Sequence, residues 1–355
     1  MKLKFICAPA SGNGGTETVL VKALNHLCQK YQIELFLTTI PENRVWLKRM
    51  NERIKIHEIK NKNKFAKLKY LSQIFLFSKS TDHFIILGAN TIKLASKIRK
   101  LTRKKYSITS WIHYSLINQD MFNPKNIKLA DNHLAISTPI KNQLKNLGIN
   151  DEKISLIFNP VSQYDGKLNQ LNNSEELKLV YVGKIMLDGQ KNLHELFDGI
   201  KKYPKDIRLD LFGADNTNGK VQEYVKKLGI DDKCVFHGWT KDPWKIILNE
   251  IKPNALVLTS KYEGLPMVMI EAMSRGIPCI VADFSGYEDI ITFNNSNGMV
   301  YHQGNVMDFV NKLNLLSNKK YIPEEVKNSI SKFYSDNYNE RLDNALEKYL
   351  SERKC

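Results

Sequence analysis

The chain has 355 residues, 42% of them hydrophobic and 25% charged, which is enough for two globular domains and excludes a disordered or fibrous protein. Its five cysteines are scattered and form no C-x-x-C pair, which argues against a zinc site or disulfide framework and favours a reducing compartment. The first apolar run is too short for a signal peptide, and no run reaches the ~20 apolar residues of a membrane span. We therefore expect a cytoplasmic protein.

The net charge of +16 is concentrated in one segment. Residues 41–106 hold 18 Lys and Arg against 4 Asp and Glu, which leaves about +2 for the rest of the chain. A solvated lysine-rich surface would explain this excess, and so would a face that meets anionic phospholipid or a phosphorylated glycolipid. Residues 65–79 mix lysines with aromatic and aliphatic residues, which fits an interfacial helix on the inner face of the membrane or a buried helix with lysines at its rim.

Short apolar runs alternate with longer helical patterns, which is typical of βαβ units with parallel sheets. In the first half we expect strands at residues 3–7, 33–38, 84–87, 107–112 and 133–136. The helices expected there span residues 16–30, 93–101 and 138–147. The pattern of strands and helices changes at residues 154–162, and the polar, turn-rich stretch 163–176 follows. This region is the best linker candidate.

The same pattern restarts in the second half. Strands are expected at residues 177–182, 207–212, 235–236, 255–259 and 278–282, and helices at 192–202, 219–228, 244–250 and 266–275. We therefore predict a Rossmann-like domain at 1–160, a second one at 161–325, and one or two C-terminal helices at 326–355 that pack back toward the first domain. Ligands bind outside the carboxyl ends of the strands in such α/β sheets.

The strongest chemical signal follows the strand at residues 255–259. Glu263 comes just after the strand, a Gly-Leu-Pro sequence then begins a helix, and Glu271 follows eight positions later. Backbone N–H groups at such a helix start can bind a diphosphate, and Glu263 would reach a sugar attached to it. The residues assigned to donor binding here are Gly264, Leu265, Pro266, Met267 and Glu271.

This segment resembles the E-x7-E region of retaining glycosyltransferases of family 4. The resemblance implies an α/β protein of GT-B architecture, with two Rossmann-like domains facing each other across a cleft. It also implies a nucleotide-sugar-binding C-terminal domain, an acceptor-side N-terminal domain, and a hexosyltransfer that retains the anomeric configuration. Residues 11–18 match the family's glycine-rich loop after the first strand, where Gly14 and Gly15 would let backbone amides approach the donor phosphate.

Two lysines match the family's pair of cations that neutralise the departing diphosphate. They are Lys184 and Lys191, and Gly183, just before the first lysine, is also assigned to donor binding. The first is usually arginine in the family, and the spacing between the two is about two residues longer here than in most members. Either residue type can stabilise a leaving group electrostatically, although lysine carries a point charge and lacks the paired donors of the arginine guanidinium.

Two further positions follow from the resemblance. Trp239, after Phe-His-Gly, lies where the family lines the nucleotide base, although a buried core position fits this tryptophan equally well. His113, at the end of a first-half strand, matches a family position that faces the donor sugar. The catalytic candidates are thus Glu263, Lys191, Lys184 and His113.

Residues 181–199 more closely resemble lipopolysaccharide 1,6-galactosyltransferases, which share the long Lys184–Lys191 spacing. This implies UDP-galactose as donor substrate and a cell-surface glycan or glycolipid, such as lipopolysaccharide core, as acceptor. No other cofactor is expected, and the absence of an Asp-x-Asp motif gives no indication of a metal-bound diphosphate.

Several alternatives stay open at this point. Within the same fold the enzyme could transfer glucose or an N-acetylhexosamine in polysaccharide synthesis, or act as a nucleotide-sugar epimerase. A nicotinamide oxidoreductase is disfavoured because residues 12–15 do not make a G-x-G-x-x-G fingerprint. A non-catalytic basic protein that binds membrane or nucleic acid would explain the charge but not the E-x7-E context, and we expect no nucleic-acid partner.

Overall fold

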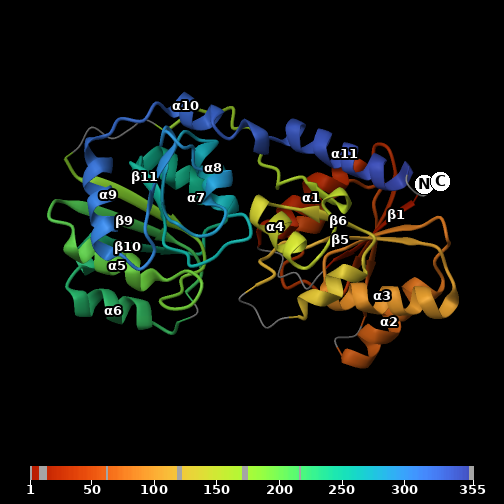
Figure 1. Cartoon of the computed structure of the whole chain (residues 1–355). Helices are drawn as coiled ribbons and strands as arrows, with labels where there is room; N and C mark the ends of the chain where they lie inside the picture. Colours follow the sequence, from red (N-terminus) through yellow and green to blue (C-terminus); the bar gives the residue numbers. More distant parts are fainter. Residues whose placement is uncertain are drawn as a thin grey trace. The chain divides into compact units, whose positions relative to one another are not determined.

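The structure is a computed structural model that describes residues 2–7, 14–60, 63–117, 122–169, 175–215 and 217–351. The chain divides into two compact units. Unit 1 comprises Met1–Pro160 with Ser335–Cys355, and unit 2 comprises Val161–Tyr334. Each unit is built on one parallel sheet with helices against it (Figure 1), so the predicted α/β class is confirmed.

Unit 1 contains a seven-stranded sheet in the order β3-β2-β1-β4-β5-β6-β7. The strands are β1 (Lys2–Cys7), β2 (Gln32–Leu37), β3 (Lys55–Glu58), β4 (His83–Ile86), β5 (Ser107–Trp111), β6 (Asn132–Ala135) and β7 (Ile154–Leu156). The helices are α1 (Gly15–Leu27), α2 (Lys64–Leu76), α3 (Ala89–Thr102), α4 (Thr138–Asn146) and α11 (Ser335–Ser351). Every residue of β4, β5 and β6 is buried, as expected for central parallel strands covered on both faces.

The last helix belongs to unit 1 although it follows unit 2 in the chain. Asp343 of α11 accepts hydrogen bonds from His26 (3.0 Å) and Lys30 (2.6 Å), at the end of α1 and just beyond it. The Tyr349 hydroxyl donates to the carbonyl of His133 in β6 at 2.9 Å. In Figure 1 this helix, drawn in blue, lies beside the red N-terminal helix.

Unit 2 contains a six-stranded sheet in the order β10-β9-β8-β11-β12-β13. The strands are β8 (Leu177–Val182), β9 (Ile207–Phe212), β10 (Cys234–Gly238), β11 (Ala255–Leu258), β12 (Cys279–Ala282) and β13 (Gly298–Tyr301). The helices are α5 (Leu193–Lys202), α6 (Lys220–Leu228), α7 (Pro243–Ile246), α8 (Met267–Met273), α9 (Val306–Asn318) and α10 (Pro323–Asn328). No helix in the described ranges combines the length and the apolar character that crossing a bilayer requires.

Most predicted elements agree with the structure within a few residues. Three strands were not predicted, namely β3, β7 and β13. The sequence of β3 is Lys-Ile-His-Glu, a polar edge strand, and β7 has only three residues, within the stretch expected to begin the linker. The first has a single apolar residue, and the second is shorter than the four to eight residues on which strand prediction depends.

The order of strands places one reversal in each sheet. In unit 1 it lies between β1 and β4, and in unit 2 between β8 and β11. The loops that leave the carboxyl ends of two such strands run to opposite sides, which opens a crevice between them. The loops after β8 and β11 are therefore the first place to look for a ligand site in unit 2.

Candidate active site

The loops after β8 and β11 bring Lys191 and Glu263 into direct contact. Lys191 Nζ lies 2.6 Å from Glu263 Oε1, and Gln190 Nε2 lies 3.3 Å from Glu263 Oε2. Each carboxylate oxygen thus has its own donor, which fixes the orientation of the carboxyl group. The two residues that the sequence separates by 72 positions form one charged pair at the point where the strand order reverses.

Backbone hydrogen bonds hold the same two loops together. The N–H of Lys261 donates to the carbonyl of Gln190 at 2.8 Å, and the Thr259 hydroxyl donates to the carbonyl of Lys191 at 3.0 Å. The Gln190 side chain also donates to the carbonyl of Tyr262 at 3.0 Å. Charged groups held in this way do not have to reorganise when charge develops nearby.

The pair is partly shielded from solvent. The side chains of Lys191 and Glu263 keep 17% and 10% of their accessible surface. Burying either charge alone would carry a large desolvation penalty, and the attraction between the two charges offsets part of it. A lysine ammonium has three donors, and Glu263 takes one of them, so Lys191 retains donors for an anion placed beside it.

Gly183 and Lys184 begin the loop that leads to Lys191. A Cβ on Gly213 would lie 1.7 Å from the carbonyl oxygen of Gly183, so only glycine lets the strand end of β9 approach this loop. The Tyr181 hydroxyl donates to the carbonyl of Lys184 at 2.7 Å, and burial raises the pKa of Tyr181, which keeps this donor protonated. The Lys184 side chain itself is exposed.

The segment from Gly264 to Glu271 leads into α8 and through most of it. Pro266 was expected in the first helical turn, but it is the residue before α8, with extended backbone (ψ 96°) and no side-chain cap. Leu265 and Pro266 are buried, whereas Met267 and Glu271 are half-buried. The first N–H groups of a helix have no intrahelical partner, so this end of α8 offers donors to an anion.

Trp239 is 58% exposed, so the interpretation of this residue as part of the core is wrong. It follows β10 directly after Gly238, whose φ of 67° lies in the left-handed region. The neighbouring His237 is held from two sides. Its Nε2 lies 2.7 Å from Asp210 Oδ1, and its ring stacks on Phe212 at 4.2 Å, which fixes the turn that presents the tryptophan.

The remaining predicted residues lie in unit 1. Gly14 precedes α1 and Gly15 is its first residue, beyond the end of β1; residues 11–13 of the predicted glycine-rich loop lie outside the described ranges. A Cβ on Gly14 would meet Glu17 Oε2 at 2.8 Å. His113 lies two residues beyond β5, which is separated from β1 by β4 alone.

His113 is an uncharged residue in this setting. Its Nε2 is buried and has no hydrogen-bond partner within the part of the chain that the structure describes. Burial lowers the pKa of His113 to about 3, so the ring is neutral at physiological pH. A neutral imidazole with an unpartnered nitrogen can exchange a hydrogen bond with a hydroxyl group but cannot supply positive charge.

Sequence analysis missed Gln190 and Thr259, which position the charged pair. Gln190 directly precedes Lys191 within residues 181–199, and this position is the only sign of its role in the sequence. No group of three or more His, Cys, Asp or Glu side chains in the described ranges is arranged to hold a metal ion.

Comparison with known proteins gives consistent matches over the whole chain. Residues 167–352 match the family model "Glycosyl transferases group 1". The chain is 34% identical to a lipopolysaccharide 1,6-galactosyltransferase of Escherichia coli K12 over the full length of both proteins. It is 33% identical to the Salmonella typhimurium enzyme of the same description, over 98% of each chain.

Solved structures agree with these matches. The apo form of the lipopolysaccharide outer core galactosyltransferase WaaB aligns with a TM-score of 0.85 at 32% identity, over 98% of this chain and all of that one. Anabaena HepE in complex with UDP and glucose aligns with a TM-score of 0.79 at 15% identity, over 98% of this chain and all of that one, which is a likeness of fold alone. The predicted GT-B architecture and the predicted family resemblance are thereby confirmed.

Proposed function

Because the chain belongs to the glycosyl transferases group 1 family, we propose that it transfers galactose from UDP-galactose onto a sugar of lipopolysaccharide core. The observation that carries the proposal is the Lys191–Glu263 pair, held by two loops at the strand reversal of unit 2. The full-length similarity to the E. coli and Salmonella enzymes supports galactose as the sugar and a 1,6-linkage.

In this proposal unit 2 binds the nucleotide-sugar. Lys191, with Lys184 as the second cation, neutralises the charge that develops on UDP as the bond from the anomeric carbon to the diphosphate breaks. Backbone amides at Leu265–Met267 bind the same diphosphate, Glu271 accepts from the ribose hydroxyls, and Trp239 lines the base. Glu263 lies beside the sugar, where its fixed negative charge stabilises a cationic anomeric carbon.

Unit 1 supplies the acceptor side. An acceptor hydroxyl attacks the anomeric carbon on the face that UDP leaves, so the configuration is retained. A new carbon–oxygen bond replaces the broken one, and the acceptor's proton passes to the departing phosphate. His113, being neutral, exchanges a hydrogen bond with a hydroxyl of the donor sugar, and Gly14 and Gly15 let backbone amides approach the donor phosphate.

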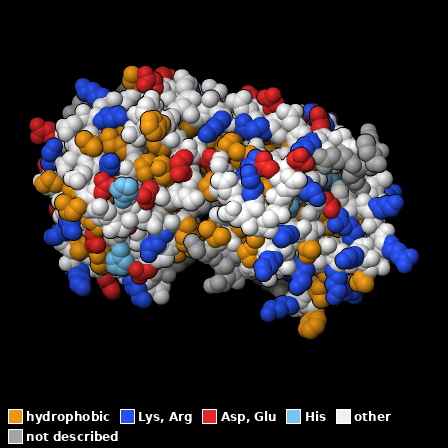
Figure 2. Space-filling model, in the orientation of Figure 1, with side chains coloured by type: hydrophobic (Ala, Val, Ile, Leu, Met, Phe, Trp, Pro, Cys, Tyr) orange, Lys and Arg blue, Asp and Glu red, His pale blue; other side chains and the backbone are white. Residues whose placement is uncertain are grey.

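The basic segment 41–106 fits an association with anionic lipid. In Figure 2 Lys and Arg side chains gather over the part of unit 1 that holds α2 and α3. At the two ends of α2, Phe65 and Phe77 are 85% and 82% exposed. Aromatic residues surrounded by lysines are typical of interfacial helices, and each cation near an anionic leaflet gains about 1 kcal/mol.

Vesicle sedimentation tests the membrane proposal. Wild-type protein should bind phosphatidylglycerol vesicles and leave phosphatidylcholine vesicles in solution. Phe65→Asp with Phe77→Asp should lower the binding, whereas Phe293→Asp, at a fully exposed phenylalanine of unit 2, should leave it unchanged. Equal binding by all three proteins would contradict the proposal.

UDP release tests the reaction itself. The purified protein is incubated with a panel of UDP- and GDP-hexoses, with and without EDTA. We expect slow UDP release from UDP-galactose that EDTA does not change and that an acceptor with lipopolysaccharide core accelerates. UDP release only from a different UDP-hexose would overturn the assignment of galactose. Inhibition by EDTA would contradict a metal-independent transfer.

A further inference from the structure

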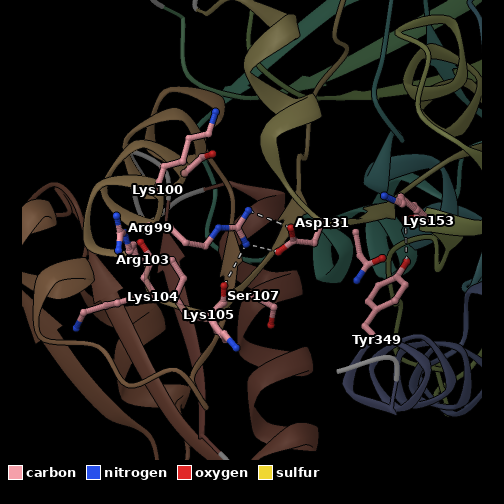
Figure 3. Close-up of a pocket in the computed structure, with 12 residues that line it drawn as sticks. Arg99, Lys100, Arg103, Lys104, Lys105, Ser107, Asp131, Lys153 and Tyr349 are labelled. Carbon is pink, nitrogen blue, oxygen red and sulfur yellow. Dashed lines mark hydrogen bonds and ion pairs between the residues drawn. The ribbon is translucent and has the colours of Figure 1, made fainter. Parts of the chain in front are cut away.

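A pocket of about 660 Å³ lies at the amino edge of the unit 1 sheet, the edge opposite to Gly15 and His113. Its wall includes Ser107 and Asn132, the first residues of β5 and β6, together with Tyr349 of α11. Figure 3 shows side chains from these separate segments around one hollow. No part of the proposed reaction uses this edge of the sheet.

Positive charge dominates the wall of this pocket. Six of its residues are cations, namely Arg99, Lys100, Arg103, Lys104, Lys105 and Lys153. Among the described residues of the wall the one acidic side chain is Asp131, and Arg99 holds both of its oxygens, at 2.5 Å and 3.0 Å. The acid is therefore already neutralised, and five further cations surround the same hollow.

Ordinary structural roles account for only part of this charge. Arg99 and Lys100 lie in the last turn of α3, where cations favour the negative end of the helix dipole. Lys104 Nζ donates to the carbonyls of Leu76 and Ser78, at 2.5 Å and 2.6 Å, and so holds the end of α2. Lys153 comes from a distant segment, just before β7, and neither role explains why it lines the same pocket.

Arg103 contributes its cation from an uncommon backbone conformation. It ends α3 in the left-handed conformation, with φ of 54°, and its N–H donates to carbonyls of the last helical turn. Glycine or asparagine usually occupies such a position because a side chain strains it. Here an arginine occupies it, and its side chain lines the basic pocket.

We propose that this pocket binds a ligand that carries two or more phosphate groups. Lysine ammonium groups attract phosphate as point charges, and the Arg103 guanidinium can hold one phosphate with two parallel bonds. The volume lies within the range of small-molecule sites and exceeds what one phosphate fills. The ligand is a soluble oligophosphate or the phosphorylated headgroup of a lipid, and the binding does not depend on the proposed galactosyl transfer.

Calorimetric titration with inorganic tripolyphosphate tests the site. The pocket variant combines Arg103→Gly with Lys153→Gln, and a matched control combines Lys201→Gln with Lys202→Gln, two exposed lysines in the last turn of α5. We expect saturable binding that weakens about tenfold or more in the pocket variant and less than about twofold in the control. Affinity for UDP should be the same in all three proteins.

Equal weakening in both variants would show attraction by net charge alone and would overturn the proposal, as would a wild-type protein that shows no saturable binding. The thermal midpoint of Arg103→Gly should equal or exceed that of wild type, because glycine suits the left-handed position, so lost binding is not lost folding. Vesicles that contain cardiolipin, whose headgroup carries two phosphates, then identify the source. Weaker vesicle binding by the pocket variant supports a lipid headgroup, and unchanged vesicle binding with weaker tripolyphosphate binding supports a soluble anion.

Discussion

The two units gather cations in opposite ways. At the carboxyl edge of the unit 2 sheet, Lys191 is matched by Glu263 at 2.6 Å, and both loops are tied by backbone bonds. At the amino edge of the unit 1 sheet, six cations share a pocket with a single acid that Arg99 already holds. A paired cation stays in one place, which suits a group that must meet a transition state. A cluster in which cations outnumber acids produces a strong potential, which suits the capture of an anion.

Removal of the paired cation should have the largest effect. Lys191→Ala is expected to lower the rate of UDP release and of galactosyl transfer by about 10²–10³-fold, because the leaving diphosphate loses a preorganised charge. Lys201→Ala, which removes an exposed lysine of α5 in the same unit, should leave the rate unchanged. Steady-state kinetics of both variants make the comparison, and a loss below tenfold for Lys191→Ala would contradict the assigned role.

Removal of the partner charge separates binding from chemistry. Glu263→Gln keeps the shape of the side chain and its contact with Lys191 but removes the negative charge. We expect kcat to fall about 10²-fold, while UDP binds at least as tightly, because Lys191 no longer has a competing carboxylate. Calorimetry with UDP and turnover measurements give the two quantities. Equal weakening of UDP binding and turnover would indicate that the loop has collapsed and that Glu263 only supports the structure.

Two histidines, one half-buried and one buried, extend the comparison to acid stability. In unit 2, His237 faces Asp210 at 2.7 Å, whereas His133 in unit 1 has the Ser110 hydroxyl as its partner, also at 2.7 Å. Burial lowers the pKa of His133 to about 4. Below the ordinary histidine pKa of about 6.5, His133 binds a proton in the unfolded chain but stays neutral in the folded chain. Stability is therefore lost as the pH falls from about 6.5 toward 4.

The slope of this loss is at most about 1.4 kcal/mol per pH unit for one histidine. Urea unfolding between pH 4.5 and 7 should therefore show a weaker pH dependence in His133→Gln than in wild type. His302→Gln provides the control, because the His302 side chain is 80% exposed. Parallel pH profiles for wild type and His133→Gln would show that the buried ring does not govern acid stability.

Much of the fold could be predicted because the central strands are continuous apolar runs. Strands β8 and β9 were placed with their observed ends, since charged residues precede each strand and a glycine follows it. The edge strand β3 carries no such run and the edge strand β7 has only three residues, since an edge position needs neither burial on both faces nor length. Their existence follows from pairing with β2 and β6, which the local sequence does not encode.

The Lys191–Glu263 pair and the basic pocket of unit 1 also differ in how far the sequence predicts them. Lys191 and Glu263 could each be predicted from a motif, but their contact depends on two loops that meet through the sheet order. The pocket of unit 1 could not be predicted at all. Its basic segment was evident, yet Lys153 and Tyr349 join it from distant parts of the chain.

The smallest expected effect concerns two equivalent helix ends. In unit 2, α6 ends on Gly229 with φ of 66°, whereas in unit 1, α3 ends on Arg103 with φ of 54°. Left-handed backbone costs a residue with a side chain about 1 kcal/mol that glycine does not incur. Arg103→Gly should thus raise the free energy of unfolding by up to about 1 kcal/mol in urea titrations, while Arg103→Ala, which removes the same charge but keeps Cβ, should not. Equal effects would attribute the change to relief of charge repulsion in the pocket. A gain confined to glycine would show that the chain gives up stability to keep a cation at the end of α3, where α6 ends on glycine.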